Sequence, residues 1–156
     1  MCGIIGFVGE TDAPRIIING LKKLEYRGYD SAGLAVLNND KLQLAKAKGR
    51  VADLEAKVLD KQLTGKLEIG HTRWATHGQP SEANSHPHTN QAQTIAVVHN
   101  GIIENYQELK TKLLKKGVKF RSQTDTEVVA HLIDQYMTGD LLEAVAQAVR
   151  QLQGSF

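Results

Sequence analysis

Cys2, the one cysteine of this 156-residue chain, is the residue whose type and position most directly suggest chemistry. Gly3 follows it, and removal of Met1 would leave a cysteine with its own free α-amine. An unperturbed α-amine has a pKa near ~8, so it can act as a base around neutral pH. Cys2 would then supply both nucleophile and base, as in the pairing of threonine with an N-terminal amine. The alternative is a small buried hydrophobic side chain.

Two arginine-containing segments are further candidates. Residues 26–33 read Tyr-Arg-Gly-Tyr-Asp-Ser-Ala-Gly, either a helix end with a turn or a tight loop in which Arg27 supports a charged site. Residues 71–78 read His-Thr-Arg-Trp-Ala-Thr-His-Gly and follow an expected strand, where functional loops often begin. Arg73 could hold a carboxylate through two parallel hydrogen bonds. Trp74, the single tryptophan, could instead be part of the core.

A third segment, 97–101, ends in Asn100-Gly101 after an apolar run. An amide side chain beside an unhindered backbone N–H can stabilise the negative oxygen that forms when a carbonyl is attacked. Asn-Gly is also the strongest short signal for a turn, so this pair alone leaves both interpretations open.

Five of the six histidines fall between positions 71 and 99, namely His71, His77, His86, His88 and His99. They could suggest zinc, but the chain has neither a cysteine pair nor a His-Glu-x-x-His motif, and we expect no metal. A papain-like Cys–His pair is also disfavoured, because Cys2 precedes a strand and not a helix. The sequence holds no Gly-x-x-x-x-Gly-Lys-Ser/Thr loop for phosphates, and we expect no cofactor.

Periodicity and turn residues predict one α+β domain with a largely antiparallel sheet. Apolar runs predict strands at 3–8, 31–37, 41–48, 66–72 and 94–100, with a hairpin turn at 38–40. We expect a first helix to begin after Asp12, which can cap it. Helical patterns also cover residues 51–58, 105–116, 124–136 and 141–152. Thr124 and Glu127 have the spacing of a capping box at the start of the fourth helix.

Composition excludes several classes of protein. Hydrophobic residues make up 41% and charged residues 23%, which does not fit a disordered chain. A net charge of +2 with 5% aromatic residues gives no basis for nucleic-acid binding. No apolar run approaches the roughly 20 residues of a membrane span, and no basic start precedes an apolar segment as in a signal peptide. With one cysteine and no internal disulfide, we expect a cytoplasmic protein without membrane contact.

Five segments together closely resemble the glutaminase domain of the glucosamine-6-phosphate synthase family. They are MCGIIG at 1–6, LEYRGYDSAGLAV at 24–36, HTRWATHGQPSEANSHPH at 71–88, VVHNGIIENY at 97–106 and SQTDTEVVAHL at 122–132. The resemblance implies that residues 1–156 are part of a type-2 glutamine amidotransferase domain. It also implies an N-terminal nucleophile hydrolase fold, an αββα sandwich of two antiparallel sheets between helical layers.

The same resemblance implies roles for individual residues. Cys2 would attack the side-chain amide of L-glutamine, Asn100 and Gly101 would hold the oxyanion, and Arg27 would order the site beside the nucleophile. For substrate binding, Arg73 would hold the α-carboxylate of glutamine with help from Thr76 and His77. Asp125 would bind the α-ammonium group, and Trp74 would belong to a lid-like loop. Glutamate and ammonia would be the products.

In that family, ammonia passes to a C-terminal sugar-isomerase region that converts fructose 6-phosphate to glucosamine 6-phosphate, and we expect the full-length enzyme to be a homodimer. Residues 154–156 resemble the start of a further strand, so we expect a domain truncated at its C-terminus. Two alternatives stay open. The chain could bind glutamine without hydrolysing it, or it could serve a related amidotransferase with another acceptor.

Overall fold

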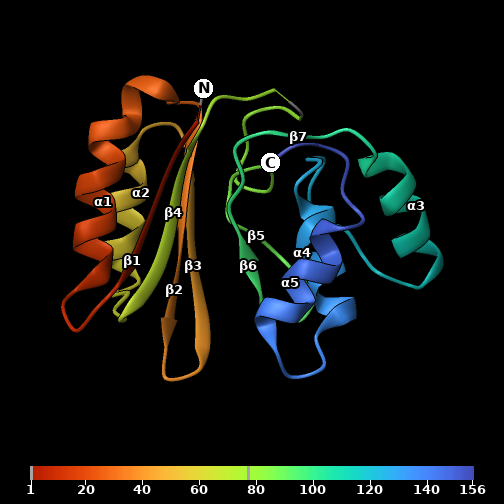
Figure 1. Ribbon diagram of the computed structural model, residues 1–156. Coiled ribbons are helices and arrows are strands. Elements are labelled where there is room, and N and C mark those ends of the chain that lie inside the picture. Colours follow the sequence, from red (N-terminus) through yellow and green to blue (C-terminus); the bar gives the residue numbers. More distant parts are fainter. Residues whose placement is uncertain (1, 77) are drawn as a thin grey trace.

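The computed structural model describes residues 2–76 and 78–156, and a four-stranded antiparallel sheet lies near its centre (Figure 1). The strands are β1 (Gly3–Val8), β2 (Ser31–Asn38), β3 (Lys41–Lys48) and β4 (Leu67–Arg73), in the order β1-β4-β2-β3. The expected strands at 3–8, 31–37, 41–48 and 66–72 are therefore confirmed. β4, the strand that ends in Arg73, is an inner strand and is paired on both sides.

The hairpin between β2 and β3 turns at Asn39 and Asp40, whose φ angles are 47° and 59°. Positive φ at both central residues is the signature of a type I′ turn, which matches the twist of the flanking strands. Asn and Asp tolerate this left-handed conformation better than most residues. The turn predicted at 38–40 is thus confirmed, with its conformation explained by these two residue types.

Helices α1 (Ala13–Leu24) and α2 (Val51–Asp60) cover one face of the sheet (Figure 1). A short 3₁₀ helix, η1 (Glu25–Arg27), continues from α1. Ile17, Leu21 and Leu54 are fully buried between these helices and the sheet. β4 meets this layer at Gly70, where a Cβ would lie 2.5 Å from Ile17 Cγ2. Because side chains alternate along a strand, His71 points to the opposite layer.

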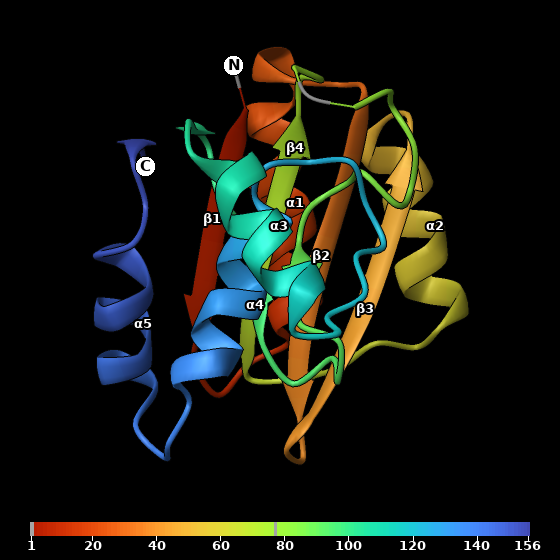
Figure 2. The ribbon, with the colours of Figure 1, turned by 90° about the vertical axis from the view of Figure 1, so that its right-hand side faces the viewer.

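The opposite layer, which faces the viewer in Figure 2, carries shorter strands in two two-stranded antiparallel sheets. β5 (His88–Thr89) pairs with β6 (Ala96–Val97), and β7 (Ile102–Ile103) pairs with β8 (Gly154–Ser155). Helices α3 (Tyr106–Lys115), α4 (Glu127–Tyr136) and α5 (Leu141–Val149) lie outside them and share a second core that includes Ile103 and Val128. The expected α+β class, with antiparallel sheets between helical layers, is confirmed.

The strand expected at 94–100 is wrong in length, because only Ala96–Val97 pair as a strand. Its first amides are bound locally, since the Asn90 side-chain oxygen accepts hydrogen bonds from Thr94 N at 2.8 Å and Ile95 N at 3.0 Å. At the other end, His99 N donates to a side chain and not to a neighbouring strand. Such side-chain bonds compete with the regular ladder.

The capping box expected at 124–127 is also wrong. Helix α4 begins at Glu127, and Thr126 at its N-cap makes no side-chain capping bond. In a capping box the Glu127 carboxylate would bind the backbone N–H of Thr124. It instead binds the N–H groups of Arg121 and Ser122, which lie further upstream. Asp125 consequently precedes the helix and does not lie in its first turn. Asp12 does occupy the N-cap of α1, but its side chain makes no capping bond.

Across residues 2–76 and 78–156, no helix combines the length and the apolar character needed to cross a membrane.

Candidate active site

A pocket of about 180 Å³ opens where β1 begins and β4 ends. It is smaller than the roughly 300–1,000 Å³ of sites for drug-sized ligands, which suits a small metabolite. Seven residues that the sequence singled out line it together: Cys2, Arg73, Trp74, Thr76, Asn100, Gly101 and Asp125. Arg27 is half-buried in η1 and lies outside this lining. His77 falls outside the described residues.

Cys2 lines the pocket and is held there by Trp74, which directly follows β4, and by Asn100. Trp74 N–H donates to Cys2 Sγ at 3.4 Å, and Asn100 Nδ2 donates to the Cys2 carbonyl at 3.3 Å. Gly3 N–H donates to Thr72 Oγ1 at 3.1 Å. The contact with Asn100 connects residues that are 98 positions apart, so the amide side chain and the thiol belong to one site.

Arg73 is the last residue of β4 and is only 4% exposed. One of its guanidinium nitrogens, Nη2, donates to the Gly78 carbonyl at 3.1 Å. Burial lowers the pKa of Arg73, while the charges of Cys2, Asp30 and Asp125 act in the opposite direction. Arginine stays protonated in proteins, so the pocket contains a largely desolvated positive charge that suits a carboxylate.

Asp30 fixes the loop that carries Arg73 and Trp74. Its N–H donates to the Arg73 carbonyl at 3.1 Å, and its Oδ2 accepts from Ala75 N–H at 2.8 Å. Gly28 packs on the same loop, since a Cβ there would lie 2.8 Å from the Arg73 carbonyl carbon. Segment 26–33 therefore shapes the site through Gly28 and Asp30, whereas the sequence had drawn attention to Arg27.

Trp74 does not belong to the core. Its side chain is 44% exposed at the rim of the pocket and meets Tyr29 edge-on, with ring centroids 5.5 Å apart. Thr76 is exposed on the same rim. Both residues are thus placed where they can contact a ligand as it enters.

Asp125 also lines the pocket and is 6% exposed. Its Oδ2 accepts a hydrogen bond from Ile103 N–H at 2.8 Å, which fixes the orientation of the carboxylate. Oδ1 makes no hydrogen bond to any other residue within 2–76 and 78–156, so it can accept one from a ligand. The pocket thus presents a cation at Arg73 and an anion at Asp125.

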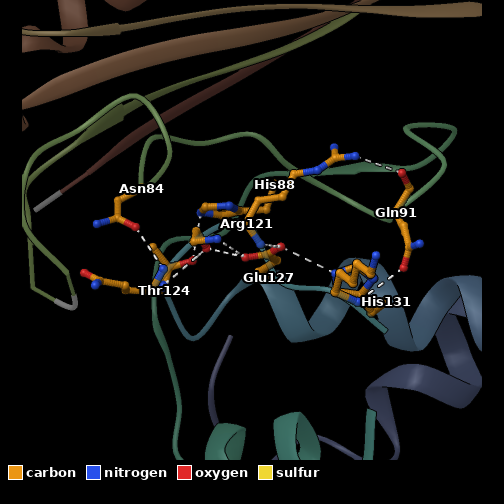
Figure 3. Close-up of polar contacts among 10 residues, drawn as sticks. Asn84, His88, Gln91, Arg121, Thr124, Glu127 and His131 are labelled. Atoms are coloured by element: carbon orange, nitrogen blue, oxygen red, sulfur yellow. Dashed lines mark hydrogen bonds and ion pairs between the residues drawn. The ribbon is translucent and has the colours of Figure 1, made fainter. Parts of the chain in front are cut away.

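A polar network anchors the segment that carries Asp125 (Figure 3). The Glu127 carboxylate accepts from Arg121 N and Ser122 N, both at 2.7 Å, and Thr124 Oγ1 lies 2.9 Å from His88 Nε2. Burial would raise the pKa of Glu127, but hydrogen bonds from His131, Ser122 and the Arg121 N–H lower it to about 2. Glu127 is therefore a buried carboxylate that stays charged at neutral pH.

Three buried histidines pack together beside the pocket, and one of them, His86, lines it. The rings of His71 and His86 stack with centroids 4.1 Å apart, and those of His86 and His88 meet at 4.6 Å. Burial lowers the pKa of His71 to about 4, that of His88 to about 3 and that of His86 well below its usual value. They are neutral near pH 7. In the described ranges, no group of three or more His, Cys, Asp and Glu side chains is arranged to hold a metal ion.

The sequence interpretation missed four polar residues that line the pocket: His86, His99, Thr124 and Thr126. The concentration of histidines between positions 71 and 99 is visible in the sequence, but it suggests only metal binding or a papain-like Cys–His pair. The two threonines fall beside Asp125, and their contribution depends on contacts that sequence spacing does not reveal.

Residues 71–156 match a family model described as a glutamine amidotransferase domain. The chain belongs to this family. Over its whole length it is 57% identical to the glutamine–fructose-6-phosphate aminotransferase (isomerizing) of Clostridium perfringens and 56% identical to that of Aquifex aeolicus. It spans about a quarter of the length of these relatives, 26% in each case.

Solved structures support the same grouping. The chain superposes with a TM-score of 0.83 on the glutamine phosphoribosylpyrophosphate amidotransferase of B. subtilis, at 30% identity. A second structure, described as the allosteric regulatory enzyme of purine biosynthesis, gives 0.86 at 31% identity. Each match covers 99% of this chain, and 33% and 34% of the respective structures. The N-terminal nucleophile hydrolase fold expected from the sequence is confirmed.

Proposed function

We propose that this domain hydrolyses L-glutamine to glutamate and ammonia through a thioester on Cys2. One observation supports this most strongly. The folded chain gathers a cysteine, an Asn-Gly pair, a buried arginine and a fixed aspartate in one small pocket, although they come from four distant segments. This set contains a nucleophile, donors for an oxyanion and two opposite charges suited to an amino acid.

The reaction would begin once Met1 has been removed. The α-amine of Cys2 accepts the thiol proton, and Sγ attacks the side-chain amide carbon of glutamine. Asn100 Nδ2–H and Gly101 N–H stabilise the negative oxygen of the tetrahedral intermediate. The protonated amine returns its proton to the leaving nitrogen, ammonia departs and a thioester stays on Cys2. Water, activated by the same amine, then adds to the thioester carbonyl and releases glutamate.

Substrate selection follows from the two charges. Arg73, assisted by Thr76 and His77, would bind the α-carboxylate, and Asp125 Oδ1 would accept a hydrogen bond from the α-ammonium. Trp74 would close over the bound amino acid as part of the rim loop. Arg27 would act indirectly, by ordering the segment next to the nucleophile.

The fate of ammonia belongs to the longer protein. The relatives named above are glutamine–fructose-6-phosphate aminotransferases (isomerizing), of which this chain spans about a quarter. By analogy, residues 1–156 would form part of a type-2 glutamine amidotransferase domain that feeds a C-terminal sugar-isomerase region. That region would bind fructose 6-phosphate and form glucosamine 6-phosphate, in a homodimeric enzyme of the cytoplasm.

Glutamate release from glutamine tests the central proposal, on a sample whose N-terminus has been verified by mass. We expect release by the processed protein and none by Cys2→Ala. Glutamine binding measured by calorimetry, with no release from a chain that begins at Cys2, would support a silent binding domain instead. Release that survives Cys2→Ala would show that another group is the nucleophile.

A further inference from the structure

His99 makes an unusual number of contacts for a residue at the rim of a pocket. Its backbone N–H donates to His86 Nδ1 at 3.4 Å, and its carbonyl lies 3.1 Å from His71 Nε2. Its ring lies 3.0 Å from Thr126 Oγ1 through Nδ1 and 3.3 Å from the Ser155 carbonyl through Nε2. Both the peptide groups and the imidazole of His99 are therefore fixed by neighbours.

The two histidines that bind the His99 backbone do so as neutral rings. His71 must donate from Nε2 to a carbonyl, so its proton is on Nε2 and its buried Nδ1 carries a lone pair. His86 must accept at Nδ1, so its proton is on Nε2. Their stacked arrangement and burial agree with this assignment, because two charged rings 4.1 Å apart would repel each other. The pair fixes the peptide that leads into Asn100.

The His99 ring reaches in the other direction, toward Asp125 and β8. Only a hydrogen-bond donor fits against the Ser155 carbonyl, so Nε2 carries a proton, while Nδ1 forms the hydrogen bond with the Thr126 hydroxyl. The same Ser155 carbonyl lies directly over Gly101, where a Cβ would be 1.9 Å away. The Ser155 carbonyl therefore contacts the His99 ring on one side and packs against Gly101 on the other.

We propose that His99 is a positioning residue that couples the Asn100–Gly101 segment to the Asp125 segment through its hydrogen bond with Thr126. The proposal rests on the glutaminase function given above. His99 directly precedes Asn100, and Thr126 directly follows Asp125. One side chain thus connects the donors for the oxyanion with the carboxylate for the ammonium group. A ligand that orders Asp125 would thereby also order Asn100 and Gly101.

Thr126→Val, with Thr126→Ser as its conservative partner, tests the coupling. Valine keeps the shape of threonine but removes the hydroxyl, whereas serine keeps the hydroxyl. We expect kcat for glutamine hydrolysis to fall about tenfold in Thr126→Val, which corresponds to roughly 1.4 kcal/mol, with KM changed less than twofold. Thr126→Ser should restore most of kcat. Thr111→Val, which removes an exposed helical hydroxyl bonded to the Gln107 carbonyl, is the matched control and should change neither parameter.

A second pair of variants tests the ring itself. Asparagine places an amide near the position of Nδ1, and glutamine places one near Nε2. We expect His99→Asn to retain the contact with Thr126 and more of kcat than His99→Gln. Alkylation of Cys2 by iodoacetamide, a small uncharged reagent, should proceed at the wild-type rate in all these variants, because the thiol itself is not altered.

Amide resonances separate this inference from the proposed function. Even if the wild-type protein releases no glutamate, the resonances of Asn100 and Gly101 should shift in Thr126→Val and return in Thr126→Ser. Unchanged resonances and unchanged kcat in Thr126→Val would overturn the coupling. An equal loss in Thr126→Ser and Thr126→Val would overturn it as well, because packing and not the hydroxyl would then be responsible.

Discussion

The Glu127 carboxylate accepts hydrogen bonds from both the backbone N–H and the hydroxyl of Ser122, at 2.7 and 2.5 Å. Glu127 is 2% exposed, and the Arg121 N–H and His131 bind its other oxygen. The residues it holds lead directly to Asp125 at the edge of the pocket. A buried charge with four donors therefore determines the course of a loop that reaches the active site.

Replacing Glu127 by glutamine should destabilise the fold and weaken glutamine binding together. An amide offers one acceptor oxygen where the carboxylate offers two, so buried N–H groups lose partners, at a cost of about 2–4 kcal/mol. Chemical denaturation monitored by circular dichroism measures the loss. Glu108→Gln on the exposed face of α3 is the control, and an equal effect of both substitutions would contradict this explanation.

The same carboxylate predicts how stability depends on acid. The folded-state pKa of Glu127 is about 2, below its ordinary value of 4.5, so its contribution is complete above pH 4.5. It is lost as the pH falls from 4.5 toward 2, because the unfolded chain takes up the proton first. We expect Glu127→Gln to flatten the stability profile in this window. An unchanged slope between pH 4.5 and 2 would show that other groups control acid unfolding.

Glu68 of β4 predicts the opposite dependence. It is buried, neither oxygen has a hydrogen-bond partner among residues 2–76 and 78–156, and burial, together with the nearby Asp12, raises its pKa from 4.5 to about 8. The folded state keeps this proton while the unfolded chain loses it, so stability falls as the pH rises from 4.5 to 8.

Glu68→Gln should therefore be nearly neutral at pH 4 and stabilising by roughly 2–4 kcal/mol at pH 8. Urea unfolding at both pH values gives the comparison. Glu10→Gln, at an exposed position, should show no such difference. Equal effects of Glu68→Gln at the two pH values would mean that folding does not raise the pKa of Glu68.

Two substitutions of Asp125 separate its structural role from its role in binding glutamine. Asp125→Asn keeps an oxygen for the Ile103 N–H but removes the charge, whereas Asp125→Ala removes both. Truncating one partner of a buried charge pair typically costs about 2–5 kcal/mol. Both variants should bind glutamine much more weakly, and Asp125→Ala should also lower the melting temperature. Unchanged glutamine affinity in Asp125→Asn would reduce Asp125 to a structural residue.

Retention of Met1 should abolish glutamine hydrolysis nearly as completely as Cys2→Ala. A preceding methionine converts the basic α-amine of Cys2 into an amide, which cannot accept a proton near neutral pH. Mass spectrometry separates processed from unprocessed samples prepared in the presence or absence of methionine aminopeptidase. Full activity in a sample that retains Met1 would eliminate the amine as the base.

Hydrogen exchange should rank the strands of the 156-residue chain. β4 is paired on both sides, while β7 and β8 pair with each other over two residues only. Short pairs leave most of their N–H groups accessible. β8 is exposed whereas the equally short β5 is buried, so β7 and β8 should exchange fastest and β4 slowest. Uniform protection of all strands in a monomer would contradict this ranking.

The sequence predicts those elements that depend on local pattern. β1 coincides with the expected 3–8, and the hairpin turn is determined by Asn39 and Asp40 alone. The predictions from sequence fail where a side chain binds backbone N–H groups in place of the expected partner. The Asn90 side chain shortens β6, and the Glu127 carboxylate binds upstream N–H groups in place of a capping box.

The sequence predicts those site residues whose side-chain type alone indicates a chemical role. Cys2 offers a nucleophile, Arg73 a charge and Asn100 an amide donor beside a glycine, and the structure brings the three together. His99 and Thr126 were missed because their contribution is geometric. Their significance appears only when segments 27 positions apart meet.

The side chains of β4 alternate between the two faces of the sheet, and this limits how the sequence of the strand can change. On one face Gly70 admits Ile17 of α1, and on the other His71 and Arg73 face the active-site layer. Losing or gaining one residue within 67–72 would exchange the two faces, and so place a histidine or arginine against α1 and a glycine behind the pocket. Length variation among descendants of this domain should therefore accumulate in segments such as the β2–β3 turn, while β4 diverges by substitution alone.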